Sequence, residues 1–189
     1  AFINTNMDRH IITVEDPIEY YFDHALSIVN QREVGTDVIS FSEALKRALR
    51  MDPDVVMVGE MRDLETIESA IRAAETGHLV FGTLHTPSAP KTIDRVIDAF
   101  PADEQSQARL SLSESLAGVV SQQLLRTSDG KGRCAANEIL IRTSGLANVI
   151  REGNTPMLLN IIQSGKSQGM QTMDDALIAV MDAKYHYLF

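Results

Sequence analysis

The residues best suited to chemistry in this sequence follow short apolar runs. In DPDVVMVGEMRD (residues 52–63), the run from Val55 to Val58 leads directly into Gly59 and Glu60. A short β-branched run that ends in an acidic residue is typical of a buried parallel strand that delivers a carboxylate to a ligand. We therefore expect Glu60 to lie at a phosphate–magnesium site and to hold Mg²⁺ through water. Arg62 is a further candidate for nucleotide binding at this site.

Two other apolar runs, HIITVEDPIEY (10–20) and HLVFGTLHT (78–86), end in the same way. The polar residues that follow them are Glu15, Asp16, Glu19, His85 and Thr86. The carboxyl ends of parallel strands line the ligand crevice of an open sheet, so these side chains converge if the three strands are neighbours. A nucleoside triphosphatase needs such a set: an acid for magnesium, an acid for the attacking water and a donor near the γ-phosphate.

The positions of these polar residues after the three apolar runs predict their catalytic roles. Glu60 lies on the magnesium side, Glu15 acts on the attacking water, and His85 senses or stabilises the γ-phosphate. The choice of principal base between Glu15 and Glu60 stays open, with Glu15 favoured. Structural alternatives exist, because acids after strands often cap the next helix, as we expect for Asp63. His78 follows a glycine at a helix end, where it would complement the helix dipole.

The elements that must position these residues alternate along the chain. After the first strand, Ser40 and Glu43 have capping-box spacing and start a helix that Pro53 ends, and Asp63 starts a second helix. Further helices are expected over 87–100 and 103–125, and a last strand over 136–141. This order predicts an α/β fold with a mostly parallel sheet over 1–143, followed by a C-terminal helical appendage over 144–189.

Composition narrows the class of protein. The 189 residues are 44% apolar, and no apolar run is long enough to cross a bilayer. A formal net charge of −9 disfavours nucleic acid as a partner, whose binding relies on cationic groups. The single cysteine, Cys134, excludes an internal disulfide and a multi-cysteine zinc site. We expect a soluble, cytoplasmic protein.

The chain resembles the ATPase domain of the type II and type IV secretion ATPases, the family that also drives type IV pili. TVEDPIEY is similar to the family's Asp box, DPDVVMVGEMRD to its Walker B segment and TGHLVFGTLHT to its His box. The resemblance implies a three-layer RecA-like P-loop NTPase core. It also implies nucleotide- or magnesium-binding roles for the motif residues Glu15, Asp16, Glu19, Glu60, His78 and His85.

Within the family, SQQLLR, IREGNTP and GMQTMDDAL are similar to the branch that retracts type IV pili. The resemblance implies a homohexamer that uses ATP and Mg²⁺ at the cytoplasmic face of the inner membrane and contacts the pilus membrane-platform protein. The alternative is an extension or secretion ATPase. Those members usually carry a four-cysteine zinc module, which one cysteine cannot form.

The phosphate-binding loop of such an enzyme has the pattern G-x-x-x-x-G-K-[ST]. Gly165-Lys166-Ser167 is the one Gly-Lys-Ser here, but the required earlier glycine is Asn160, and TPMLLNIIQSG reads as a helix that Gly165 ends. In the family the loop precedes the Asp box by a short helix. We therefore expect the chain to be a C-terminal fragment without the Walker A region and inactive alone. The alternative is a non-catalytic ring or interaction domain.

Overall fold

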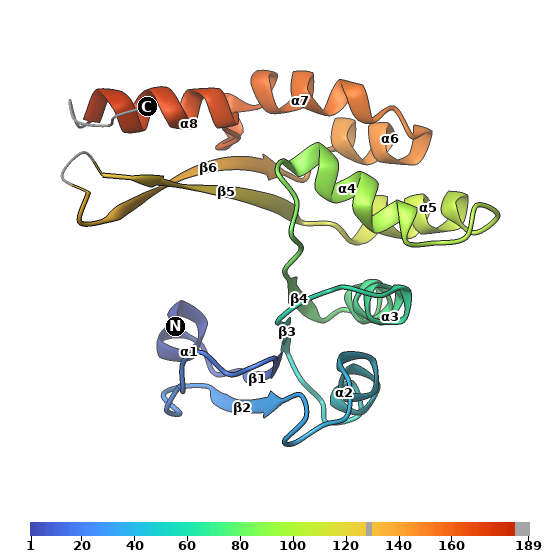
Figure 1. Cartoon of the computed structure of the whole chain (residues 1–189). Helices are drawn as coiled ribbons and strands as arrows, with labels where there is room; N and C mark the ends of the chain where they lie inside the picture. Colours follow the sequence, from blue (N-terminus) through green and yellow to red (C-terminus); the bar gives the residue numbers. More distant parts are fainter. Residues whose placement is uncertain (128–129, 184–189) are drawn as a thin grey trace. The chain divides into compact units, whose positions relative to one another are not determined.

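The computed structural model describes residues 1–127 and 130–183 (Figure 1). The contacts divide the chain into two compact units, Ala1–Leu84 and His85–Phe189, and each is described by itself. The predicted division into a core over 1–143 and a helical appendage over 144–189 stays a prediction. Residues 184–189 of that appendage lie outside the described residues.

The first unit contains a four-stranded, entirely parallel sheet, which confirms the predicted fold class. Its strand order is β2-β1-β3-β4. The strands are β1 (His10–Glu15), β2 (Ile28–Glu33), β3 (Val55–Val58) and β4 (Leu79–Gly82). The sequence analysis missed β2, because IVNQRE is mostly polar and only Val29 in it is buried.

Helices α2 (Phe41–Ala48) and α3 (Leu64–Glu75) pack together beside this sheet (Figure 1). The core between the helices and the sheet contains Leu45 from α2, Ala70 from α3, and Val56 and Val58 from β3. A short helix, α1 (Phe2–Asn6), precedes β1. Burial of side chains from both helices and the strand fixes the sheet in place, since apolar burial is the main favourable term in folding.

The ends of α2 and α3 follow the predicted signals. The Ser40 hydroxyl accepts a hydrogen bond from the Glu43 N–H, and the Asp63 carboxylate accepts one from the Thr66 N–H at 2.9 Å. Gly77, after α3, has a φ of 101°, a left-handed conformation that favours glycine. Both N-caps are therefore confirmed.

The second unit holds α4 (Ala89–Asp98), α5 (Gln105–Ser115) and an antiparallel hairpin of β5 (Gly118–Arg126) and β6 (Arg133–Ile141). The predicted helix over 103–125 is wrong from residue 116 onward. GVVSQQLLR forms β5 instead and pairs along its whole length with β6, from Gly118 with Ile141 to Arg126 with Arg133. Pairing with β6, which the residue pattern of 118–126 alone does not show, overrides the predicted helix.

The remaining elements of the second unit are helical. They are α6 (Ser144–Glu152), α7 (Leu158–Ser164) and α8 (Met173–Ala183), with 3₁₀ turns at Thr155–Met157 and Lys166–Gln168. Gly165 follows the end of α7, as predicted, and Lys166 Nζ pairs with Asp175 Oδ2 at 2.8 Å. The Gly-Lys-Ser sequence thus lies at a helix end, with its lysine in an ion pair.

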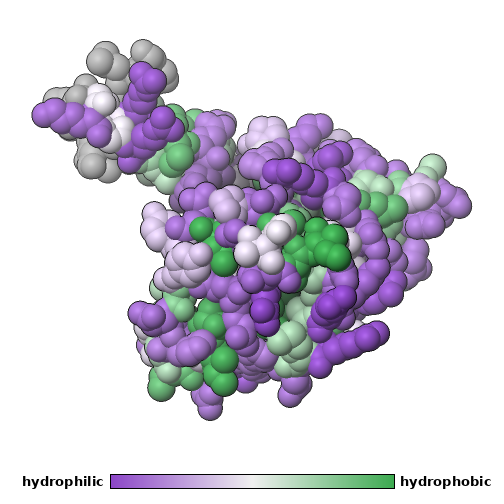
Figure 2. All heavy atoms as spheres, turned by 60° about the horizontal axis from the view of Figure 1, so that its bottom comes forward, coloured by the Kyte–Doolittle hydropathy of each residue, from purple (hydrophilic) through white to green (hydrophobic). Residues whose placement is uncertain are grey.

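Apolar side chains reach the surface in separate patches between polar ones (Figure 2). Ile28 and Ile39 of the first unit, for example, are 58% and 82% exposed. No helix among the described residues is long and apolar enough to cross a membrane.

A substitution in the core of the first unit tests its packing. Leu45 is fully buried against β3, so Leu45→Ala should lower the free energy of unfolding by about 2–5 kcal/mol. Lys46→Ala, at the next and exposed position, should cost less than about 1 kcal/mol. Chemical denaturation measures both, and equal losses would contradict the assigned core.

Asp54 joins the starts of β1 and β3. Its Oδ2 accepts a hydrogen bond from the His10 N–H at 2.8 Å, and its Oδ1 pairs with Arg9 Nη1 at 3.2 Å. The hydrogen bond from the His10 backbone, followed by the Arg9 charge, lowers the pKa of Asp54.

A lowered pKa in the folded state predicts a definite pH dependence. The stabilisation from Asp54 is complete above its unfolded pKa, about pH 4, and is lost as pH falls through the lower folded value. Asp54→Asn should remove this part of the acid dependence of the unfolding free energy. Equal slopes for the two proteins below about pH 4 would show that the Asp54 contacts are not formed in solution.

Candidate functional site

The carboxyl ends of β1, β3 and β4 meet at one edge of the sheet. These strands are adjacent and parallel, as the sequence analysis required for convergence. The Gly59 N–H donates to the Val14 carbonyl at 2.7 Å, and the Met61 N–H donates to the Thr83 carbonyl at 3.0 Å. The Thr83 hydroxyl donates to the Gly59 carbonyl. Backbone pairing therefore continues past the strand ends and fixes the segments that carry Glu15 and Glu60.

Gly59 allows a close approach of two backbones at this edge. A Cβ at this position would lie 3.0 Å from the Val14 carbonyl oxygen and 3.1 Å from the Cα of Glu15. Both distances are shorter than most contacts that Cβ atoms make in proteins, and both atoms contacted belong to the backbone. The absence of a side chain at Gly59 is thus what lets the Glu60 segment run directly beside Glu15.

Glu15 is a buried carboxylate, only 7% exposed. Its Oε1 accepts a hydrogen bond from the Thr13 hydroxyl at 2.6 Å and another from Gln31 Nε2 at 3.0 Å. Among the described residues, no hydrogen bond reaches its other oxygen, Oε2. A buried carboxylate with one oxygen held and one left for a ligand is suited to bind or deprotonate water.

Glu60 and Arg62, which follow the end of β3, form an ion pair with each other. Arg62 Nη2 lies 2.5 Å from Glu60 Oε2, and the Glu60 side chain is 19% exposed whereas that of Arg62 is 66% exposed. The hydrogen bond to Glu60 and its charge raise the pKa of Arg62, with a smaller contribution from Asp16. The guanidinium is thus a permanent positive charge among acids at the sheet edge.

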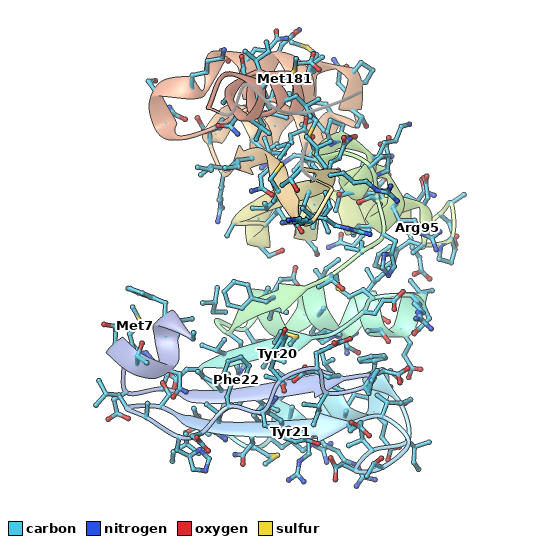
Figure 3. All side chains as sticks on the ribbon, turned by 60° about the vertical axis from the view of Figure 1, so that its left-hand side comes forward. Met7, Tyr20, Tyr21, Phe22, Arg95 and Met181 are labelled. Atoms are coloured by element: carbon cyan, nitrogen blue, oxygen red, sulfur yellow. The ribbon has the colours of Figure 1, made fainter. Side chains whose placement is uncertain are left out.

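Asp16 and Glu19 lie in the loop between β1 and β2, and both are exposed. This loop is held to β2 by the Ile18 N–H, which donates to Glu33 Oε2 at 3.0 Å. The same loop carries Tyr20, Tyr21 and Phe22 (Figure 3). The predicted acids of the Asp box thus divide into one buried residue, Glu15, and two at the surface.

His78 lies at the amino-terminal end of the strands, because it precedes β4, whereas Glu60 lies at their carboxyl end. A strand of four residues places it about 13 Å from the carboxyl end. Its Nδ1 lies 2.9 Å from the Ala73 carbonyl oxygen and 3.1 Å from the Thr76 hydroxyl, at the end of α3. These contacts favour the helix-end alternative, and the nucleotide-binding role of His78 stays a prediction.

His85 begins the second unit and is exposed. The nearby Thr86 hydroxyl is 2.7 Å from that of Thr92 in α4. The first unit by itself therefore places Glu15, Glu60 and Arg62 at the carboxyl ends of adjacent strands and pairs Arg62 with Glu60. The γ-phosphate role of His85 stays a prediction.

Over residues 1–127 and 130–181, no group of three or more histidine, cysteine or acidic side chains is arranged to hold a metal. The carboxylates at the sheet edge fit Mg²⁺ in a different way, since this ion keeps several waters and takes one or two carboxylates plus phosphate oxygens. Glu60, partly exposed at a strand end, would be such a carboxylate.

Three polar residues at the site were missed by the sequence analysis: Thr13, Gln31 and Thr83. Thr13 was detectable, because it lies two residues before Glu15 and therefore on the same face of the strand. Gln31 was not, since its place opposite Thr13 depends on the pairing of β1 with β2.

Two acids at the ends of adjacent parallel strands, beside an arginine, form the kind of site that nucleoside triphosphatases use. Comparison with known proteins agrees with this class. The chain belongs to the type II/IV secretion system protein family, whose model matches residues 1–177. The predicted family resemblance is confirmed.

Curated relatives carry more specific names. The chain is 56% identical to the type IV pilus retractation ATPase PilT of Pseudomonas aeruginosa, over 93% of this chain and 51% of that protein. It is 53% identical to a twitching motility protein of Neisseria gonorrhoeae, over 93% of this chain and 47% of that protein. The chain thus spans about half the length of these relatives.

Solved structures give the same fold. The pilus retraction motor PilT with bound ADP matches with a TM-score of 0.81 and 51% identity, over 94% of this chain and 54% of that chain. The ATPase DotB of Legionella pneumophila matches with a TM-score of 0.74 and 26% identity, over 94% of this chain and 53% of that chain. The parallel α/β architecture is therefore that of this ATPase family.

The close approach at Gly59 predicts a cost for any side chain there. Gly59→Ala should lower the free energy of unfolding by about 1–3 kcal/mol, because the new methyl group meets backbone atoms that cannot move aside alone. Gly145→Ala is the matched control, since its Cβ would meet only the Thr143 hydroxyl at 3.8 Å. If thermal unfolding shows no difference between the two variants, the tight pairing of β1 with the Gly59 segment is wrong.

Proposed function

We propose that the protein containing this chain is an ATPase motor that powers type IV pilus retraction and twitching motility. The observation that carries the proposal is the position of Glu15 and Glu60 at the carboxyl ends of adjacent parallel strands, in a chain that matches retraction ATPases by sequence and fold. One retraction motor of similar fold has been solved with bound ADP, which supports nucleotide as the ligand.

The proposed chemistry is hydrolysis of ATP. Glu15 Oε2 takes a proton from water, the water oxygen attacks the γ-phosphorus, and the bond to the β–γ bridging oxygen breaks to release ADP and phosphate. Glu60 would hold Mg²⁺ through water, and the ion would supply positive charge against the phosphates. Burial and the two hydrogen bonds on Oε1 favour Glu15 over Glu60 as the base, since Glu60 is already paired with Arg62.

The remaining motif residues have supporting roles in this proposal. Asp16 and Glu19 lie on the loop that follows Glu15 and would bind waters of the magnesium ion. Arg62 would bind a phosphate oxygen, and His85 would contact the γ-phosphate. His78 would act on nucleotide at the amino-terminal end of the strands, because it precedes β4.

The phosphate cradle is the part of the site that this sequence lacks, since no G-x-x-x-x-G-K-[ST] pattern occurs in it. We propose that the cradle comes from the half of the relatives' length that this chain does not span. The isolated chain would then bind ATP weakly and be inactive. We further propose a homohexamer, at the cytoplasmic face of the inner membrane, that contacts the pilus membrane-platform protein.

Substitution of the two acids tests the site. In the full-length product of the gene, Glu15→Gln and Glu60→Gln should each reduce kcat for ATP by about 100-fold or more, since each removes a charge that acts in the transition state. Glu68→Gln, on the exposed side of α3, is the control and should keep full activity. Unchanged turnover in either site variant would overturn that residue's assignment.

A second function within the family is pilus extension or secretion. It is favoured by a relative named type II secretion system protein E from Aeromonas hydrophila, which is 49% identical over 64% of this chain. A deletion strain separates the two functions by microscopy. Loss of a retraction motor leaves excess pili that do not retract, whereas loss of an extension motor leaves a cell without pili.

A further inference from the structure

Gln31 makes three hydrogen bonds that join Glu15 to the loop between β1 and β2. Its Nε2 donates to Glu15 Oε1 at 3.0 Å and to the Tyr20 carbonyl at 2.8 Å. Its Oε1 accepts from the Phe22 N–H at 2.7 Å. We propose that Gln31 is a positioning residue that fixes the Glu15 carboxylate and the loop together, an inference that rests on the function proposed for Glu15.

Gln31 restricts the orientation of the Glu15 carboxylate. In the register of the sheet, Gln31 lies directly opposite Thr13, and both donate to the same oxygen of Glu15. Two donors on Oε1 restrict rotation of the carboxylate and leave Oε2 as the oxygen that meets water. Catalytic geometry depends on such restriction, because misplacement by about 1 Å can reduce rate about 100-fold.

Gln31 also holds the backbone of the loop between β1 and β2. Tyr20 and Tyr21 are 75% and 82% exposed, so side-chain burial does little to hold this part of the loop (Figure 3). Gln31 instead holds its backbone on both sides of Tyr21, through the Tyr20 carbonyl and the Phe22 N–H. Movement of the loop that breaks these bonds would also free the Glu15 carboxylate, so the position of the surface loop and the orientation of the base are coupled.

The contacts at position 31 require a glutamine side chain. A side-chain amide supplies two N–H donors and one acceptor, and all three functions are used here. A glutamate offers no donor when ionised and would place a second carboxylate beside Glu15. A methionine has nearly the same shape without the donors. Only an amide of this length therefore satisfies both Glu15 and the loop.

The test measures ATP turnover of the full-length gene product. Gln31→Met should lower kcat by about 10-fold or more and change KM by less than about threefold, because the base is misplaced whereas binding is kept. Gln31→Glu should also lower kcat, because an ionised carboxylate has no donor for Glu15 Oε1. Gln123→Met, in exposed strand β5, is the matched control and should behave as the unmodified protein.

A second readout does not depend on activity. Chymotrypsin cleaves after aromatic residues, so release of the loop in Gln31→Met should speed cleavage after Tyr20, Tyr21 and Phe22 at least several-fold, relative to Gln123→Met. Unchanged cleavage together with an unchanged kcat would overturn the inference. If Glu15→Gln is itself fully active, the proposed function of the site fails instead, and the cleavage result alone then decides whether Gln31 holds the loop.

Discussion

The site depends on one backbone constraint, the parallel pairing of β1 with β3 and its continuation past the strand ends. The hydrogen bond from the Gly59 N–H to the Val14 carbonyl sets the Glu60 segment beside Glu15. Side-chain chemistry alone would keep two acids apart, because like charges repel. The sheet holds them at one edge because its apolar residues, such as Val56 and Val58, are buried against α2 and α3.

Glu15 and Glu60, at the ends of the paired strands β1 and β3, have different environments. Glu15 is buried and held through one oxygen by Thr13 and Gln31, whereas Glu60 is partly exposed and paired with Arg62. Two carboxylates in different surroundings can divide the work of proton transfer and metal binding. The surface loop with Tyr20 and Tyr21 is also connected to this site, since Gln31 donates hydrogen bonds to both the Tyr20 carbonyl and Glu15.

Much of the first unit was predictable because its signals are local. The β-branched run Val55–Val58, the caps Ser40 and Asp63, and the glycine after α3 each act within a few residues, and the structure confirms them. Strands β2 and β5 were missed because each is defined by pairing with another strand and not by its own residue pattern. Gln31 was missed for the same reason. No local pattern shows which residue of a polar strand will lie opposite Thr13.

The central claim is that this sheet edge is the magnesium and water side of an ATP site. The most direct measurement is a structure of the full-length gene product with Mg²⁺ and a non-hydrolysable ATP analogue. The account predicts Mg²⁺ within about 4–5 Å of the Glu60 carboxylate, one water between them. It also predicts a water within about 3 Å of Glu15 that faces the γ-phosphorus. A nucleotide whose γ-phosphate lies more than about 10 Å from both acids would contradict it, because neither could then act on water or metal.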